Sequence, residues 1–190
     1  MIKYVVSGLL VALAVFAFRT AQYVGAFKDV EISVSEEAAK NLIYKTHVGA
    51  YHKIVPVIEE VETWAREQKI DCHLSFGEYI DNPDTSEEDR LKSHGGCIVT
   101  EIPPNLPAGF EGKTIPAQKF VKAVFDGSPG IGPLKVYPRV QKYADEHKIK
   151  LKGTVIESYE IHRDGALAPE ASESEKHQVK MTTFYYFFID

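Results

Sequence analysis

Acidic, hydroxyl and imidazole side chains alternate along one short segment near the C-terminus, residues 154–162. Read as a strand, the segment places Ser158, Glu160 and His162 on one face and Glu157 and Tyr159 on the other. A carboxylate among aromatic rings suits a lipophilic cation, because ring faces attract the charge and the carboxylate neutralises it. The same desolvation would raise the pKa of the carboxyl and allow general acid or base chemistry. A solvated carboxylate on a plain strand explains the sequence equally well.

Other chemistries find little support in the residue types and spacing. His94 and Cys97 are three apart and Cys72 adjoins His73, but the two pairs do not form matching zinc knuckles. The glycine-rich run 127–132 lacks the Gly-Lys-Ser/Thr ending of a phosphate loop. No Gly-x-Ser-x-Gly elbow occurs. We therefore expect no metal and no cofactor, and nothing singles out an axial histidine for haem.

Composition limits the protein to one globular domain or two small halves. The chain has 190 residues, 44% hydrophobic and 26% charged, which is ordinary for a folded protein. Its formal charge of −5 gives no basic surface for a phosphate backbone, so we expect no nucleic-acid partner. The two cysteines, Cys72 and Cys97, could pair outside the cytosol or stay as buried thiols; we favour thiols in an apolar core.

An apolar run near the N-terminus indicates a membrane anchor. Tyr4 to Phe18 reaches only about 22 Å as a helix, whereas continuation to Phe27 gives about 36 Å, enough for a hydrocarbon core of roughly 30 Å. A cleaved signal ending near Ala17 and a buried core helix are the alternatives. Lys3 on one side and Arg19 on the other leave the orientation open. We expect a single-pass membrane protein with the side of the membrane undecided.

Hydrophobic periodicity predicts a mixed α+β domain after the anchor. Ile54, Ile58, Val61 and Ala65 form a helical stripe within 53–69. The full set of predicted elements is strands at 29–35, 39–47, 74–80, 97–102, 115–125, 153–162 and 179–189, helices at 53–69 and 137–147, a charged connection at 84–96, and a polar loop at 164–178.

The two halves of this domain match by residue. Residues 65–70 (AREQKI) correspond to 144–149 (ADEHKI) at an offset of 79, which also sets Glu78 against Glu157. This indicates an internal duplication of a strand–helix–strand–strand unit, with repeat one at 28–104 and repeat two at 113–190. Helices on one side of a continuous sheet would leave a groove where the halves meet, which is the natural ligand site.

Several motifs resemble the GyrI-like small-molecule-binding domain. They are the run 44–51 (YKTHVGAY), 79–83 (YIDNP), 136–138 (VYP) and 160–162 (EIH), and within the superfamily the chain is most similar to the membrane-anchored branch that includes the testis-expressed reticulophagy receptor. The resemblance covers about residues 23–190. It implies a pseudo-two-fold α+β fold shared with SOUL haem-binding proteins and drug-sensing domains. It also implies an acid and aromatic rings in the groove between repeats.

The resemblance has three departures. No helix-turn-helix precedes the domain, no long acidic tail follows Asp190, and the family's Tyr two residues after the pocket Glu is His162 when Glu160 is taken as that Glu. The motif selects Glu160, whereas the duplication selects Glu157; we adopt Glu160. The predicted ligand-binding residues are Glu160, His162, Tyr137, Tyr51, Tyr79 and Tyr186.

These features predict a binding module rather than an enzyme. An anchor at residues 1–27 would tether a GyrI-like domain, residues 28–190, that captures a small apolar or lipophilic-cationic ligand. The first alternative is a hydrolase of strained electrophilic molecules that uses Glu160. The second is a protein-interaction module whose groove holds a partner.

Overall fold

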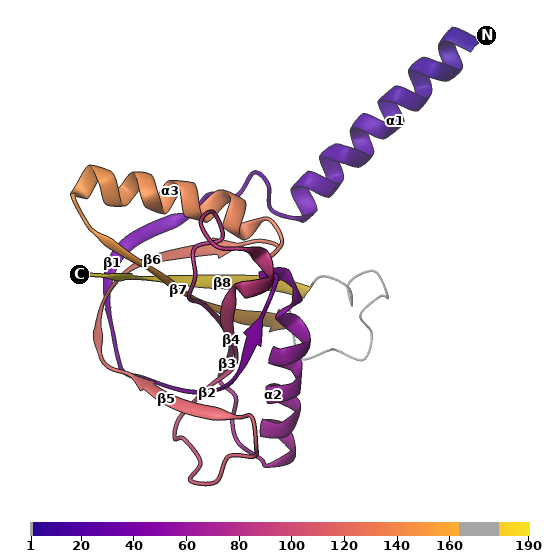
Figure 1. The fold of residues 1–190 in the computed structure, drawn as a ribbon. Coiled ribbons are helices and arrows are strands. Elements are labelled where there is room, and N and C mark those ends of the chain that lie inside the picture. Colours follow the sequence, from indigo (N-terminus) through magenta and orange to yellow (C-terminus); the bar gives the residue numbers. More distant parts are fainter. Residues whose placement is uncertain (1, 164–178) are drawn as a thin grey trace.

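One antiparallel sheet forms the centre of the domain. The computed structural model describes residues 2–163 and 179–190, and within them eight strands follow the order β1-β6-β8-β7-β3-β4-β2-β5 (Figure 1). The strands are β1 (Glu31–Glu37), β2 (Lys40–Val48), β3 (Leu74–Tyr79), β4 (Lys92–Val99), β5 (Glu111–Ile115), β6 (Gln118–Asp126), β7 (Leu151–Arg163) and β8 (Val179–Ile189). The polar loop predicted at 164–178 lies outside the described residues.

Two helices cover the same side of this curved sheet, which we call the helix face. Helix α2 (Val55–Glu67) packs on β2, β3 and β4, and α3 (Gly132–His147) packs on β6. The short turn η1 (Tyr51–Lys53) lies between β2 and α2, and η2 (Glu88–Arg90) lies between β3 and β4. Figure 1 shows both helices outside the curve of the sheet, so the opposite, inner face is concave.

The apolar core is divided between these faces. The predicted stripe Ile54, Ile58, Val61 and Ala65 is buried, as α2 requires for packing on the sheet. A second cluster lies under α3, and a third on the inner face, built around Leu42, Phe76, Phe120, Ile156 and Tyr186. Trp64, on the flank of α2, packs against Phe110 with ring centroids 5.0 Å apart.

The two helices end in the same way. Lys69 and Lys148 both have left-handed backbone, with φ of 58° and 56°. In each case the following amide closes the turn, from Ile70 to the Ala65 carbonyl and from Ile149 to the Ala144 carbonyl, both at 2.8 Å. The offset of 79 residues found in the sequence therefore holds at the helix ends.

Two predicted strand boundaries differ from the structure. Strand β4 begins at Lys92, inside the predicted charged connection, because its residues pair with β3 on one side and β2 on the other. Pairing on both sides satisfies the backbone N–H and C=O groups of β4, whatever charges its side chains carry. The strand predicted at 115–125 is observed as β6, which begins only at Gln118, after Pro116, a residue with no N–H for a ladder. Strand β5, which ends at Ile115 before this proline, was not predicted.

Helix α1 (Ile2–Tyr23) precedes the domain and projects away from the sheet (Figure 1). Its segment Lys3–Tyr23 is long and apolar enough to cross a membrane, with a mean hydropathy of 1.8, and none of its apolar window is buried within the described chain. A signal sequence has the same length and composition.

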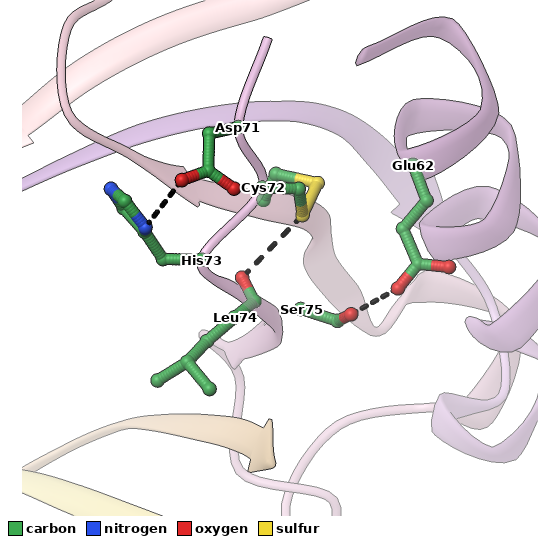
Figure 2. Close-up of a disulfide and its surroundings, with 7 residues drawn as sticks. Glu62, Asp71, Cys72, His73, Leu74 and Ser75 are labelled. Atoms are coloured by element: carbon green, nitrogen blue, oxygen red, sulfur yellow. Dashed lines mark hydrogen bonds and ion pairs between the residues drawn. A yellow bond between two sulfur atoms is a disulfide. The ribbon is translucent and has the colours of Figure 1, made fainter. Parts of the chain in front are cut away.

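A disulfide joins Cys72 to Cys97, which corrects the expectation of two buried thiols (Figure 2). Cys72 lies in the connection between α2 and β3, and Cys97 lies in β4, so β3–β4 pairing brings the two Cα atoms to 5.2 Å. Sequence spacing alone did not show this proximity. Among the described residues, no group of three His, Cys, Asp or Glu side chains is placed to hold a metal.

Candidate functional site

A buried carboxylate on the helix face is the centre of the candidate site. Glu157 of β7 is only 4% exposed, and its register partners are Gly77 of β3 and Tyr185 of β8. Its Oε1 accepts a hydrogen bond from the Tyr137 hydroxyl at 3.0 Å, and its Oε2 accepts one from Tyr159 at 3.2 Å. One donor comes from α3 and the other from the same strand, so both layers of the fold hold this carboxylate.

More tyrosines continue from Glu157 toward the start of α2. The hydroxyls of Tyr159 and Tyr79 are 3.1 Å apart, and the Tyr79 ring meets the Tyr51 ring edge-on at 4.8 Å. The Tyr51 hydroxyl donates to the Asp81 carbonyl at 2.7 Å and accepts from the Asp81 amide at 2.9 Å. Together with the buried Tyr185, these residues form what we call the Glu157 cluster: Glu157, Tyr51, Tyr79, Tyr137, Tyr159 and Tyr185.

Two glycines leave room for this cluster. A Cβ at Gly77 would come within 2.9 Å of the Tyr79 hydroxyl, beside the place that Glu157 takes in the ladder. A Cβ at Gly132, the first residue of α3, would come within 2.0 Å of the Tyr185 hydroxyl. These two glycines therefore allow α3 and the sheet to approach closely where the polar side chains of the cluster meet.

Burial determines the charge state of the cluster. Desolvation raises the pKa of Glu157 to about 7, although the Tyr137 and Tyr159 hydroxyls partly oppose the shift by stabilising the carboxylate. Burial, followed by the negative charge of Glu157, raises the pKa of Tyr79, Tyr137, Tyr159 and Tyr185. These phenols therefore stay neutral and act as hydrogen-bond donors at physiological pH.

Glu157 has no cationic partner among the described residues. Within the described part of the chain its hydrogen bonds come from tyrosines alone, and it takes part in no ion pair. Glu78 on the inner face shows the contrast, because His94 Nδ1 at 2.6 Å and Lys113 Nζ at 2.5 Å flank its carboxylate. Desolvation opposes these cations, but the net pKa of Glu78 is lowered. The negative charge of Glu78 is therefore compensated by cations within the fold, whereas that of Glu157 is not.

The structure brings together three of the predicted ligand-binding residues. Tyr51, Tyr79 and Tyr137 all belong to the Glu157 cluster. Tyr186 instead packs in the inner-face core against Phe120, with ring centroids 5.8 Å apart.

The other two predicted residues lie farther along β7. Strand alternation sets Glu160 on the face opposite Glu157, where its register partner is Thr182. His162 pairs in register with Lys180, and its side chain lies outside the described part of the chain.

Two signals in the sequence pointed to Glu157. The offset of 79 selected it, and Tyr159 follows it by two residues, which is the spacing that the resemblance implies for the pocket acid. The same offset also selected Glu78, which faces the other way. Tyr79 and Tyr159 meet at an offset of 80, one residue more than the offset at the helix ends. Strand β7 is irregular between Leu151 and Val155, where it advances four residues against two in β8 and Gly153 has a φ of +89°.

Two hollows elsewhere on the helix face are not lined by the cluster. One, of about 460 Å³, lies beside the disulfide and is lined by residues that include Glu62, Arg66 and Ser75. Figure 2 shows Glu62 and Ser75 near this disulfide. The other, of about 510 Å³, lies beside Trp64 and Phe110. Within the Glu157 cluster, Glu157 and Tyr185 are buried, and the other four tyrosines are half-buried.

Comparison with known families agrees with this architecture. The family described as GyrI-like small molecule binding domain matches residues 30–175. The chain belongs to this family. A DNA gyrase inhibitor of Pectobacterium carotovorum is 32% identical over 72 residues, which are 36% of this chain and 47% of that protein. The chain thus spans about half of this relative.

Solved structures show the same fold at low sequence identity. The EcmrR C-terminal domain covers 85% of this chain and 98% of its own length, at a TM-score of 0.61 and 15% identity. EcmrR in a DNA complex covers 99% of this chain and 69% of its own, at a TM-score of 0.63 and 14% identity. DNA is bound in that complex, and the expectation that this GyrI-like chain binds no nucleic acid stays a prediction.

Proposed function

We propose that this GyrI-like domain binds a small, mostly apolar cation against Glu157 and is tethered to a membrane by α1. The observation that carries the proposal is the buried carboxylate, which has tyrosine hydroxyls around it and, as far as the structure describes the chain, no cation beside it. A buried charge without a partner is costly, and a ligand that brings the opposite charge removes that cost. The family's small-molecule-binding character supports the same conclusion.

The surroundings of Glu157 define the ligand class further. Tyr137 and Tyr159 already donate to its oxygens, so the site has little need for additional donors from a ligand. The tyrosine rings offer faces that attract a cation and apolar surface that excludes water. A lipophilic cation with a delocalised or shielded charge fits these properties better than an ammonium group that stays hydrated.

The larger organisation belongs to the proposal as well. Residues 1–27 are the anchor and residues 28–190 the binding domain, in the manner of the membrane-anchored branch. The matching ends of α2 and α3 support an internal duplication. The junction of the two halves is then the β3–β7 pair, where Tyr79 and Tyr159 meet.

Calorimetric titration of the full chain in detergent with tetraphenylphosphonium tests the site. The Glu157→Gln variant keeps the shape of the side chain and removes its charge, so we expect at least about a tenfold loss of affinity, or roughly 1.4 kcal/mol. Triphenylphosphine oxide, a neutral compound of similar apolar character, should bind weakly to the wild type and no more weakly to the variant.

Glu160→Gln is the matched control, because Glu160 lies on the same strand and the opposite face. We expect its affinity to equal that of the wild type. Loss of affinity in Glu160→Gln alone would place the ligand at Glu160, the residue that the sequence motif selected. Equal affinities in both variants would remove the carboxylate from the mechanism.

A hydrolase of strained electrophilic molecules is the second candidate. The pKa of Glu157, about 7, favours it, because a group that titrates near neutrality can both accept and return a proton. Tyr137 lies at hydrogen-bond distance from the same carboxylate and could orient a substrate or water. Product formation with an epoxide or aziridine, followed in the wild type and Glu157→Gln, separates turnover from stoichiometric binding.

A further inference from the structure

The linker between α1 and the sheet, residues 24–28, is docked on the domain. The Val24 carbonyl accepts a hydrogen bond from the Ser128 amide at 3.0 Å. Lys28 Nζ forms an ion pair with Asp126 Oδ2 at 2.7 Å. Both partners lie at the end of β6 or in the loop that leads into α3, so the linker follows the entry to that helix.

Lys135 in the first turn of α3 extends the same contact. Its Nζ donates to the carbonyl oxygens of Gly25 at 3.2 Å, of Ala26 at 2.7 Å, and of Lys28. Three carbonyls of one short segment therefore converge on a single ammonium group. The contact depends on how the linker is folded, because an extended chain does not direct successive carbonyls to one point.

The backbone of the linker lies very close to the backbone of the loop that leads into α3. Gly25 has a φ of +82°, and a Cβ there would come within 3.0 Å of the Gly127 Cα. A Cβ at Gly127 would in turn come within 2.5 Å of the Phe125 ring and 3.0 Å of the Val24 carbonyl. Larger residues at either position would separate the two segments.

The opposite side of α3's start faces the Glu157 cluster. Gly132 lies against the Tyr185 hydroxyl, and Tyr137 donates to Glu157. Two turns of one helix thus contact the linker on one side and the buried carboxylate on the other. In Figure 1, α1 leaves the domain close to this end of α3.

We propose that the linker is a clasp that holds the first two turns of α3 closed over Glu157. A ligand reaches the carboxylate when these turns move, and that movement breaks the contacts of Lys135 with the linker. The position of the anchor relative to the domain thereby sets access to the site. This inference rests on the proposed function, because it takes Glu157 as the ligand's partner.

Hydrogen–deuterium exchange of the full chain in detergent tests the clasp without any ligand. Lys135→Met keeps the apolar stem and removes all three donated bonds. We expect amide exchange over residues 132–140 to become at least about fivefold faster, because these turns open more often. Lys142→Met is the matched control, since Lys142 lies on the same helix, is 76% exposed and forms an ion pair with Glu146 across one turn. Exchange that is unchanged in Lys135→Met overturns the clasp.

Stopped-flow binding of tetraphenylphosphonium tests whether the clasp controls access. We expect Lys135→Met to raise the association rate constant at least about threefold, with Lys142→Met equal to the wild type. Faster exchange with an unchanged association rate overturns control of access. If exchange is faster but the wild type binds no probe, the proposed function fails while the clasp itself stands, so the two failures are distinguishable.

Discussion

The Glu157 carboxyl couples folding to pH, because it titrates differently in the folded and unfolded chain. Its pKa rises from 4.5 to about 7 on folding, so the folded state holds the proton more tightly. The resulting stability is complete below about pH 4.5, declines as pH rises, and is gone above about pH 7. Relative to Glu157→Gln, we expect the wild type to lose about 3 kcal/mol of unfolding free energy across this range.

Urea denaturation near pH 5 and near pH 8 measures this difference. The Gln variant cannot ionise at this position, so its own pH dependence reports every other group in the chain. Parallel pH dependence in the two proteins would show that Glu157 keeps an ordinary pKa. The affinity for a cationic ligand should depend on pH in the opposite direction. A cation prefers the ionised carboxylate, so its affinity should increase as pH rises through about 7.

Tyr137→Phe isolates one of the two hydrogen bonds to Glu157. Loss of the hydroxyl removes a group that stabilises the carboxylate, so we expect the pKa of Glu157 to rise above 7, as followed by carbon NMR of the carboxyl. Stability near pH 8 should fall by about 1 kcal/mol. Tyr143→Phe on the same helix is the control, because Tyr143 stacks on His147 away from the cluster. Equal Glu157 pKa values in the two variants would contradict the assigned contact.

Sequence reasoning identified the tyrosines of the site more readily than its acid. Tyr51 and Tyr79 lie at element ends, and Tyr137 was predicted to begin a helix; duplication and the family resemblance both place the junction near these positions. The choice between Glu157 and Glu160 depends on which face each occupies, and that is determined by register. Alternation along β7 separates Glu157 and Glu160 onto opposite faces, but alternation alone does not say which face the helices cover.

Among the elements, α3 depends on a glycine where it begins. A methyl group at Gly132 would overlap the buried Tyr185 hydroxyl, so Gly132→Ala must move either the helix or the ring. We expect a loss of about 2 kcal/mol in urea denaturation. Gly130→Ala is the control, because its Cβ would lie 3.7 Å from its nearest neighbour, the Ser128 hydroxyl. Similar stabilities in the two variants would show that the start of α3 does not pack tightly against Tyr185.

Helices were predictable to within a few residues and central strands less so. The α2 stripe was confirmed, since periodicity reports burial directly. Helix α3 starts at Gly132 rather than Tyr137, because Pro133 is compatible with a first turn and Pro138 is accommodated inside the helix. The polar start of β4 was not predictable, because this segment is stabilised by pairing with two neighbouring strands and not by its own side chains.

For the whole molecule, the disulfide indicates the compartment that the domain occupies. Cys72 and Cys97 are 25 residues apart, and a crosslink of that length contributes about 3 kcal/mol to stability through the unfolded chain. We expect urea denaturation with and without a phosphine reductant to show this difference. The Cys72→Ala and Cys97→Ala double variant should match the reduced wild type, and a reductant effect that persists in it would have another origin.

Disulfides persist outside the reducing cytosol, so we expect the domain in an oxidising compartment. Maleimide labelling of denatured full-length chain, trapped rapidly from cells, should modify the cysteines only after reduction. Labelling before reduction would place the domain in the cytosol with free thiols. This result would also supply the orientation that Lys3 and Arg19 left open.

Trp64, the chain's one tryptophan, has an optical consequence. It packs on Phe110 about 14 Å along α2 from Val55, at the end remote from Tyr51, so its emission reports the flank of the domain. Selective excitation of this indole should follow unfolding and be insensitive to a guest beside Glu157. Tyrosine absorbance should respond to the guest instead, because five of the chain's ten tyrosines belong to the Glu157 cluster.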